Sequence, residues 1–261
     1  MNKAPNEYLL HLADNAVVLG QRVAEWCGHG PILEEDLALA NVSLDLIGQA
    51  RLLYQLVATR LGGDATEDSL AYFRDDTEFL NYTLLELPNH DALVGYAASD
   101  MDYATTIVRN FFYSALMVLL WDKLQSSTDA DLAAIAAKSL KEARYHLHHS
   151  ADWLVKFGDG TEESHQRAQA AVDHLHPYTE EFWTPSAQEE AAIANGTAPD
   201  VRALHQAWDA LVADTLATAT LKRPQTQGYV PEGKQARHSE HLSYLLGEMQ
   251  SLARAHPGAT W

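Results

Sequence analysis

Glutamate and histidine side chains on one long helical segment are the residues of this sequence that suit metal chemistry. Glu142 and His146 are four residues apart and His149 follows three residues later, so all three can share one helix face. A carboxylate with two imidazoles can bind a divalent metal, and Asp45 is the further ligand that such a site would recruit. The alternative is a solvated or interface face, and short motif matches often mislead.

A two-metal site in a helical bundle needs more ligands than this. It takes a Glu from each of two helices and a Glu-x-x-His from each of two others. The sequence has no acidic residue between Asp102 and Asp122 and no histidine between His29 and His90. The ligand count therefore predicts that this chain holds no di-metal centre, and so no cofactor of its own.

Residues equally far from a connecting turn face each other in an antiparallel helix pair. A turn near residues 126–128 puts Glu142 opposite Phe112 or Tyr113, which supply no carboxylate. A turn near residues 28–31 puts Asp45 near Asp14 or Asn15. The helix that carries Asp45 also has a polar side chain every fourth residue: Asn41, Asp45 and Gln49. We favour a hydrogen-bonded row inside the bundle over a solvated one.

Two other sets of possible metal ligands have simpler explanations than metal binding. Glu162-x-x-His165 follows a loop, and we expect it to cap a helix. His238 and His241, with Glu240 between them, begin the last predicted helix, where a metal site is possible but exposed polar residues are commoner.

The composition restricts the partners and the compartment. The formal charge is -18, from 36 Asp and Glu against 18 Lys and Arg, which argues against nucleic acid or an anionic membrane as partner. The single cysteine, Cys27, fits a reducing compartment. We expect neither a signal peptide nor a transmembrane helix, and hence a cytoplasmic protein.

Apolar residues recur at helical spacing along almost the whole chain, which predicts an all-α protein with one domain over residues 1–261. We expect helices over 6–26, 32–61, 92–125, 130–157, 161–181, 186–194, 200–222 and 237–255, with short helices at 66–87. Asp91 is the expected cap of the third long helix. The second long helix has a predicted buried stripe: Leu33, Leu37, Ala40, Leu44, Ile47, Tyr54, Val57 and Leu61. That helix and the segment 111–113 are candidate packing surfaces, facing inward or toward a partner.

Several segments resemble one family. Residues 14–51, 141–161 and 238–261 (HSEHLSYLLGEMQSLARAHPGATW) are similar to the C-subunit family of bacterial phenylacetyl-CoA epoxidase, a ring monooxygenase complex. The shorter pattern Arg74-Asp75 with Phe79-x-Asn81 also fits. The matching segments are spread over nearly the whole chain.

The resemblance implies a ferritin-like four-helix bundle with additional C-terminal helices. It also implies a homologous A subunit that carries the di-iron centre. The A and C subunits are implied to form a heteromeric core, to which a small B subunit and a reductase subunit bind. Such a complex inserts one oxygen atom of O₂ into the aromatic ring of phenylacetyl-CoA in aerobic phenylacetate breakdown. The C subunit is implied to be structural and non-catalytic, which agrees with the ligand count.

Residues Glu78, Phe79, Leu80 and Asn81 lie in an irregular region, where functional contacts often collect. They are candidates for contact with the partner subunit or the CoA substrate. The alternative is that Phe79 and Leu80 are core and Asn81 is a cap. Two other functions stay open at this point: a self-sufficient metal-binding oxidoreductase using Glu142, and a free-standing binding module for acyl-CoA, which the shortage of basic residues disfavours.

Overall fold

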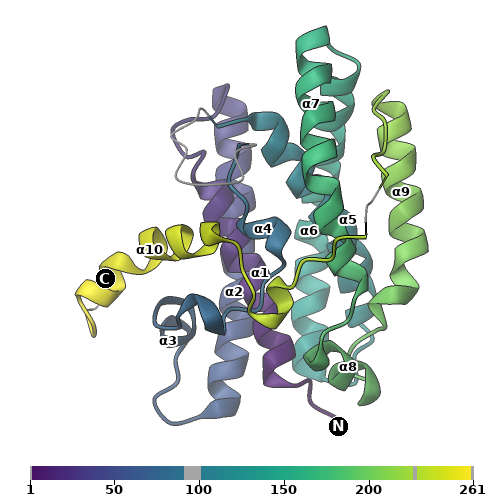
Figure 1. The fold of residues 1–261 in the computed structure, drawn as a ribbon. Coiled ribbons are helices and arrows are strands. Elements are labelled where there is room, and N and C mark those ends of the chain that lie inside the picture. Colours follow the sequence, from purple (N-terminus) through teal and green to yellow (C-terminus); the bar gives the residue numbers. More distant parts are fainter. Residues whose placement is uncertain (1, 91–100, 226–227, 260–261) are drawn as a thin grey trace. The chain divides into compact units, whose positions relative to one another are not determined.

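The computed structural model describes residues 2–90, 101–225 and 228–259 (Figure 1). Within these residues the chain forms ten α-helices and four short 3₁₀-helices, with no β-strand and a single isolated bridge between Glu232 and Arg237. The predicted all-α class is confirmed. The chain divides into two compact units. The terminal unit comprises residues 5–87 and 232–261, and the central unit comprises residues 88–231 with the first four residues. The single domain stays a prediction.

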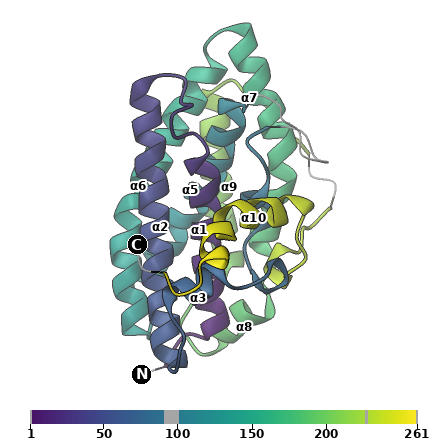
Figure 2. The same cartoon turned by 90° about the vertical axis from the view of Figure 1, so that its left-hand side faces the viewer.

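The terminal unit is built on two long helices, α1 (Asn6–Ala24) and α2 (Leu33–Leu61). They pack closely as an antiparallel pair, since Gly20 of α1 contacts Ser43 whereas the earlier Asp14 contacts the later Tyr54. The hydroxyl of Ser43 donates to the carbonyl of Gly20 over 2.8 Å. A Cβ at Gly20 would lie 3.1 Å from Ile47, so glycine permits this close approach. Figure 2 shows α2 along its full length.

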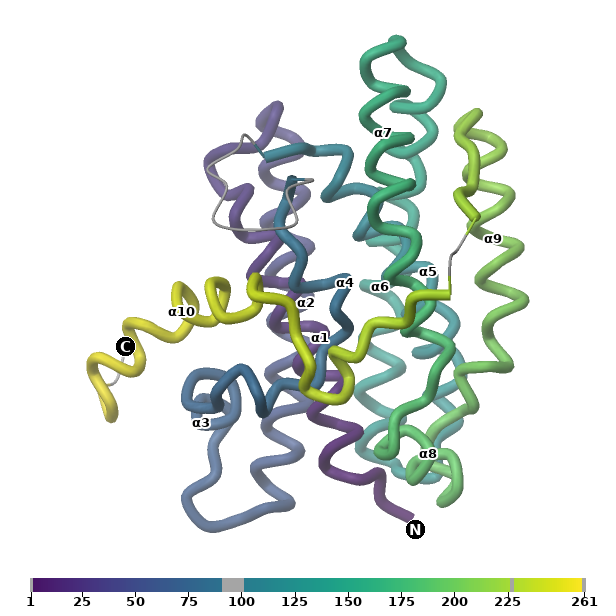
Figure 3. Tube along the Cα trace, in the orientation of Figure 1, coloured from purple at the N-terminus to yellow at the C-terminus, as the bar shows by residue number. Residues whose placement is uncertain are grey.

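The terminal unit also contains three shorter α-helices, α3 (Glu67–Tyr72), α4 (Thr83–Glu86) and α10 (Glu240–Ala255). It holds two 3₁₀-helices as well, Asp76–Glu78 and Gly233–Gln235. The prediction of short helices between residues 66 and 87 is confirmed. The C-terminal segment returns to this unit, where α10 packs against α3, α4 and α1 (Figure 3). The unit therefore joins the two ends of the sequence around α1.

The predicted buried stripe of α2 is wrong for most of its members. Tyr54 and Val57 are buried, but five members are exposed by 40% or more: Leu33, Leu37, Leu44, Ile47 and Leu61. The inner face instead carries Leu39, Val42, Leu46 and Leu53. The sequence offers two apolar faces on this helix, and the more regular one faces solvent.

The predicted register of α1 and α2 is also wrong. Asp14 contacts Tyr54, which lies nine residues beyond Asp45, or about 13 Å along the helix. The cause is the connection between the helices, which is not symmetric. The carboxylate of Asp36 accepts hydrogen bonds from the amides of Gly28 and Gly30, over 2.8 and 3.1 Å. These bonds fold the connection back along α2, so its first turns lie beyond the end of α1.

The central unit contains α5 (Tyr103–Leu124) and α6 (Ala130–Gly158), packed as an antiparallel pair. The ring of Tyr103 lies 5.6 Å from that of Trp153 and 5.9 Å from that of Phe157, which agrees with the predicted register to within about one helical turn. The third long helix begins later than predicted, because Asp102 is non-helical and caps it by accepting from the amide of Ala104. Asp91 lies outside the described residues.

Further helices surround this pair: α7 (Glu162–Leu175), the 3₁₀-helix His176–Trp183, α8 (Ala187–Ala194), the 3₁₀-helix Val201–Leu204 and α9 (His205–Thr218). Trp208 on α9 packs against Phe112 and donates to its backbone carbonyl over 3.1 Å. Residues 111–113 are buried, so this candidate surface faces inward.

Helix α5 is the one helix in the described part of the chain that is long and apolar enough to cross a membrane. Within its most apolar window, 89% of the residues are buried inside the protein. It is packed as a core helix.

Candidate functional site

The terminal unit contains a buried group of polar side chains that we call the polar cluster: Asp14, Tyr54, Arg74, Glu86 and His238, with His11, Asn15, Asn81 and Arg22 around them. Helix α1 supplies four of these nine residues. Two of the nine, Asp14 and Glu86, are carboxylates with no exposed surface. Because a buried carboxylate must be compensated, their partners determine what the cluster can do.

Asp14 is surrounded by hydrogen-bond donors from the protein. One oxygen accepts from the hydroxyl of Tyr54 over 2.6 Å and from the guanidinium of Arg74. The other oxygen accepts from Arg74 over 3.1 Å and from the amide of Leu80 over 2.9 Å. Four donors leave no free lone pair aimed at a further ligand.

The electrostatics fix the charge state of these groups. Burial and the neighbouring Asp14 carboxylate raise the pKa of Tyr54 well above its usual value, so the phenol stays protonated and donates. Burial alone lowers the pKa of Arg74, but Asp14 outweighs this and the net pKa is raised. The Arg74 guanidinium also lies 4.3 Å from the centre of the Phe79 ring, a favourable cation–π contact.

Glu86 is compensated in a similar way. One oxygen accepts from the side-chain amide of Asn81 over 2.9 Å and from Nδ1 of His238 over 2.8 Å. The other accepts from the amide of Ser239 over 2.5 Å. Nε2 of His238 lies 2.9 Å from the carbonyl of Phe79. Both ring nitrogens of His238 are therefore engaged, one by the Glu86 carboxylate and one by the backbone.

The rest of the cluster anchors the irregular segment 74–87 to α1. His11 lies 2.7 Å from the carbonyl of Leu80, and Asn15 accepts from the amide of Tyr82 over 2.7 Å. Arg22 donates to the carbonyls of Glu86 and His241, over 2.7 and 3.1 Å, and so joins this segment to α10. The cluster thus connects three parts of the chain that are distant in sequence.

This chemistry does not suit a di-metal centre. Each of the two buried carboxylates is already bound by a protein side chain, Asp14 by Arg74 and Glu86 by His238. Across residues 2–90, 101–225 and 228–259, no three His, Cys, Asp or Glu side chains form a group that could hold a metal ion. The donor set therefore binds and orients backbone and side chains, and it offers no open ligand position.

The sequence-predicted metal residues form no group of three ligands among the residues that the structure describes. Glu142, His146 and His149 all lie on α6 of the central unit, where only His146 is buried. Asp45 belongs to α2 of the terminal unit. The proposed row on α2 does not lie in the interior as a unit: Asn41 is exposed, Asp45 half-buried and Gln49 buried. A four-residue repeat drifts by about 40° per step on a helix, which takes such a row from surface to core.

The two other sets of possible metal ligands, Glu162 with His165 and His238 with His241, have different surroundings. Thr161 and Ser164, rather than Glu162 and His165, form the capping box of α7, so the predicted capping by this pair is wrong. Glu162 lies in the first turn of α7, where an acid suits the helix dipole, and His165 lies 2.8 Å from the carbonyl of Gly158. The interpretation of His238 and His241 as exposed is wrong. The His238 side chain is 6% exposed, because it pairs with Glu86, and His241 is buried.

The candidate contact segment is partly internal. Phe79 and Asn81 are buried, Leu80 is half-buried and Glu78 is exposed. Asn81 does not cap α4, whose N-cap is Tyr82, but donates to Glu86. Contact of Glu78, Phe79, Leu80 and Asn81 with a partner or substrate stays a prediction.

Sequence reasoning missed Tyr54, Arg74 and Glu86 as members of one cluster. A signal existed for Glu86, which stands within the apolar run Leu84-Leu85-Glu86-Leu87. An acid inside such a run is expected to have a cationic partner, because an uncompensated buried charge is costly. That partner, His238, lies 152 residues away in the sequence, so no local pattern identifies it.

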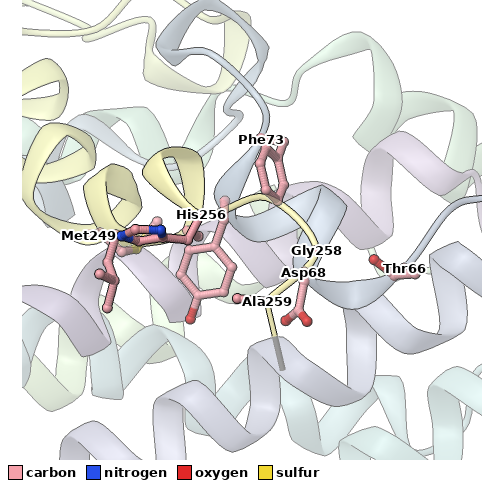
Figure 4. Close-up of a pocket in the computed structure, with 10 residues that line it drawn as sticks. Thr66, Asp68, Phe73, Met249, His256, Gly258 and Ala259 are labelled. Carbon is pink, nitrogen blue, oxygen red and sulfur yellow. The ribbon is translucent and has the colours of Figure 1, made fainter. Parts of the chain in front are cut away.

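A surface pocket of about 490 Å³ lies elsewhere on the terminal unit, between α3 and the end of α10. Figure 4 shows Phe73, Met249 and His256 around it, with Asp68 at one side. Its lining is mixed, and Leu252 at its rim is 56% exposed. It is separate from the buried carboxylates.

Comparison with known proteins gives a consistent result. The profile of a family described as "phenylacetic acid catabolic protein" matches residues 1–261. The chain is also 45% identical over 254 residues to a protein of Escherichia coli (strain K12) that is named as the C subunit of 1,2-phenylacetyl-CoA epoxidase. That alignment covers 97% of this chain and 98% of the E. coli protein.

Proposed function

We propose that this chain is a structural, non-catalytic subunit of a phenylacetyl-CoA epoxidase complex. The chain belongs to the phenylacetic acid catabolic protein family, whose fold is ferritin-like. A relative that aligns along almost its entire length is named as the C subunit of that enzyme. The full-length match supports equivalence of the whole chain rather than of one shared segment. The chain accordingly acts in phenylacetate catabolism.

The complex that we propose has a division of labour. A homologous A subunit holds the di-iron centre, and the assembly is completed by a B subunit and a reductase. The complex transfers one oxygen atom of O₂ to the ring of phenylacetyl-CoA in the cytoplasm. This chain supplies no cofactor and supports the A subunit.

The polar cluster is the observation that carries the non-catalytic part of the proposal. Asp14 and Glu86 are the kind of buried carboxylates that would bind metal in a di-iron bundle. Here Arg74 and His238 compensate them instead. Arg74 and Asp14 are 10% and 0% exposed at their side chains, so the pair is almost entirely buried. Such a pair fixes segments in place without providing a reactive position.

The supporting role follows from the same contacts. The cluster anchors the irregular segment 74–87 and the start of α10 to α1. A rigid terminal unit can hold a partner that must bind metals and admit a large thioester, since precise sites need a firm surrounding scaffold.

The test is the iron content of the full chain, measured by elemental analysis in two preparations from iron-supplemented cells. One preparation contains this chain alone, and the other contains this chain co-expressed with the A subunit. We expect iron near zero per chain in the first and iron with the complex in the second. One or two irons per chain in the first preparation would contradict the proposal and favour a self-sufficient metalloenzyme.

A further inference from the structure

The surface pocket between α3 and the end of α10, which we call the α3–α10 pocket, has the size of a small-molecule site. Its volume of about 490 Å³ falls within the range of about 300–1,000 Å³ that such sites span. Aromatic and apolar side chains from the end of α3 and from α10 form its walls: Tyr72, Phe73, Met249 and Leu252. Figure 4 shows Phe73 and Met249 beside the cavity. A ligand with an apolar body therefore meets matching surfaces from two elements.

Side chains of α10 hold the two walls of the α3–α10 pocket together without lining it. The side-chain amide of Gln250 donates to the carbonyl of Arg74 over 3.0 Å. The guanidinium of Arg254 donates to the carbonyl of Tyr72 over 3.1 Å and to the carboxylate of Asp75 over 3.0 Å. Neither Gln250 nor Arg254 lines the cavity. Because these bonds fix α10 to the end of α3, the pocket is formed without a ligand, as small-molecule sites usually are.

The charge inside the α3–α10 pocket is negative. Among the described residues that line it, Asp68 is the one carboxylate, and none is lysine or arginine. The preceding acid, Glu67, is paired with Arg51 over 2.9 Å, whereas Asp68 makes no ion pair or hydrogen bond through its carboxylate within the described part of the chain. Burial raises the pKa of Tyr72, and the carboxylates of Asp68 and Glu67 raise it further. The pocket thus combines aromatic walls with one uncompensated anionic group.

This combination selects among three classes of ligand by their charge. An anion would be repelled by Asp68 and would find no basic side chain in the pocket, which disfavours carboxylates, phosphates and CoA esters. A neutral apolar ligand would remove water from Asp68 without compensating its charge. An organic ammonium ion pairs with Asp68, and it also gains cation–π attraction from the rings of Tyr72 and Phe73. The cation is therefore the class of ligand that every part of the lining favours.

We propose that the α3–α10 pocket binds a small organic cation, an amine or quaternary ammonium ion with an apolar or aromatic body. Asp68 pairs with the positive charge, and Tyr72 and Phe73 contact the body of the ligand. Met249 completes the wall with a polarizable thioether, which packs favourably against aromatic rings. The inference is independent of the proposed function, because the lining belongs wholly to the terminal unit and includes no residue of the polar cluster.

The test uses three probes that share a phenyl ring on a two-carbon chain and differ in charge: 2-phenylethylamine, 2-phenylethanol and phenylacetate. Each is titrated at pH 7 into the full chain, labelled with ¹³C at the methionine methyl groups. The chain has four methionines, and Met249 is the one that lines the pocket, so its methyl resonance, identified with Met249→Leu, reports binding there. We expect the cationic amine to bind with a dissociation constant of about 1 mM or lower. The neutral and anionic probes should bind at least about tenfold more weakly.

Two variants test the parts of the site. Asp68→Asn removes the carboxylate, and we expect it to weaken binding of 2-phenylethylamine at least about tenfold. Its matched control is Asp64→Asn, which removes the same charge from an exposed residue outside the pocket and should change binding less than about twofold. Phe73→Leu keeps an apolar wall but removes the ring, with an expected weakening of about three- to tenfold.

Circular dichroism checks that each variant is folded, and if Asp68→Asn is not, Phe73→Leu and the three probes decide. Equal affinity for the three probes, or unchanged affinity of Asp68→Asn for the amine, would overturn the proposal. Equal losses in Asp68→Asn and Asp64→Asn would also overturn it, because the net charge of the chain would then attract the amine. A wild-type chain whose Met249 resonance does not respond to 2-phenylethylamine has no such site.

Discussion

The guanidinium of Arg74 binds the carboxylate of Asp14 through both of its terminal nitrogens, deep inside the terminal unit. Asp14 lies on α1, and Arg74 lies just after α3, where its Nε donates to the carbonyl of Leu70 over 2.6 Å. One ion pair therefore joins the long helix to the irregular segment. Arg74 also donates to the carbonyl of Glu78 over 2.9 Å, so a single side chain holds both ends of residues 70–78.

Replacing Arg74 with leucine should destabilise the chain by about 3–5 kcal/mol, because the change leaves the Asp14 charge buried without its cation. Urea unfolding of the isolated chain, followed by circular dichroism, measures this. The control is Arg51→Leu, since Arg51 pairs with Glu67 at the surface and is 63% exposed, and we expect a change under about 1 kcal/mol there. Equal losses of unfolding free energy in the two variants would show that the buried pair stabilises the chain no more than the surface pair does.

His176 should make the central unit sensitive to acid. Burial, together with the adjacent Arg223, lowers the pKa of His176 to about 4 from 6.5, and Asp209 opposes this in part. Between these pH values the unfolded chain takes up a proton that the folded chain excludes. The stabilisation is complete above about pH 6.5 and is lost as the pH falls toward 4.

The variant His176→Gln tests this sign. Glutamine keeps an acceptor for Arg223, whose Nε donates to His176 over 3.0 Å, but does not titrate. The free energy of unfolding should fall less steeply with decreasing pH in the variant than in the wild type. We expect a difference in slope of up to about 1.4 kcal/mol per pH unit between pH 6.5 and 4.5, measured by urea unfolding. Parallel profiles for the two proteins would place the sensitivity in other groups.

Gly158 should not tolerate a side chain. A Cβ there would overlap the backbone carbonyl oxygen of Ala219, which cannot move aside as a flexible side chain would. We expect Gly158→Ala to cost at least about 1–3 kcal/mol, measured by thermal unfolding. The control, Gly247→Ala, lies in α10 with nothing within 4 Å of an added Cβ, and should stabilise by about 0.5–1 kcal/mol. If Gly158→Ala left the stability unchanged, the backbone around Ala219 would have to shift at no cost to make room for the added Cβ.

The sequence predicted helix positions well because capping residues and glycines are local signals. Asp129 and Thr161 begin α6 and α7 as expected. The register of α5 and α6 was predictable to within about one helical turn, since the connection between them, residues 125–129, is short. The register of α1 and α2 was not, because it depends on how Asp36 folds the connection back. That contact joins residues six and eight positions apart and leaves no periodic pattern.

The polar cluster was hidden from the sequence for a related reason. Its pairs join Asp14 to Arg74, 60 residues apart, and Glu86 to His238, 152 residues apart. Composition and periodicity describe one element at a time, so they cannot show which buried acid meets which cation. The prediction of which face of α2 is buried was wrong for the same reason. Both of its faces are apolar, and only the position of α1 decides between them.

Glu142 provides the last prediction, because it is the residue on which the competing metalloenzyme interpretation depends. It is half-buried on α6, and the described residues place no group of metal ligands around it. Glu142→Gln keeps the shape of the side chain and removes its charge. In the complex reconstituted with the A, B and reductase subunits, we expect epoxidation of phenylacetyl-CoA within about twofold of wild type, since a supporting chain holds no reacting group. Iron per complex should also stay unchanged. A loss of about 100-fold or more in turnover, with the complex still assembled, would make Glu142 a catalytic or metal-binding residue, and the Glu142→Ala variant would then show whether the remaining activity needs any carboxylate or amide at that position.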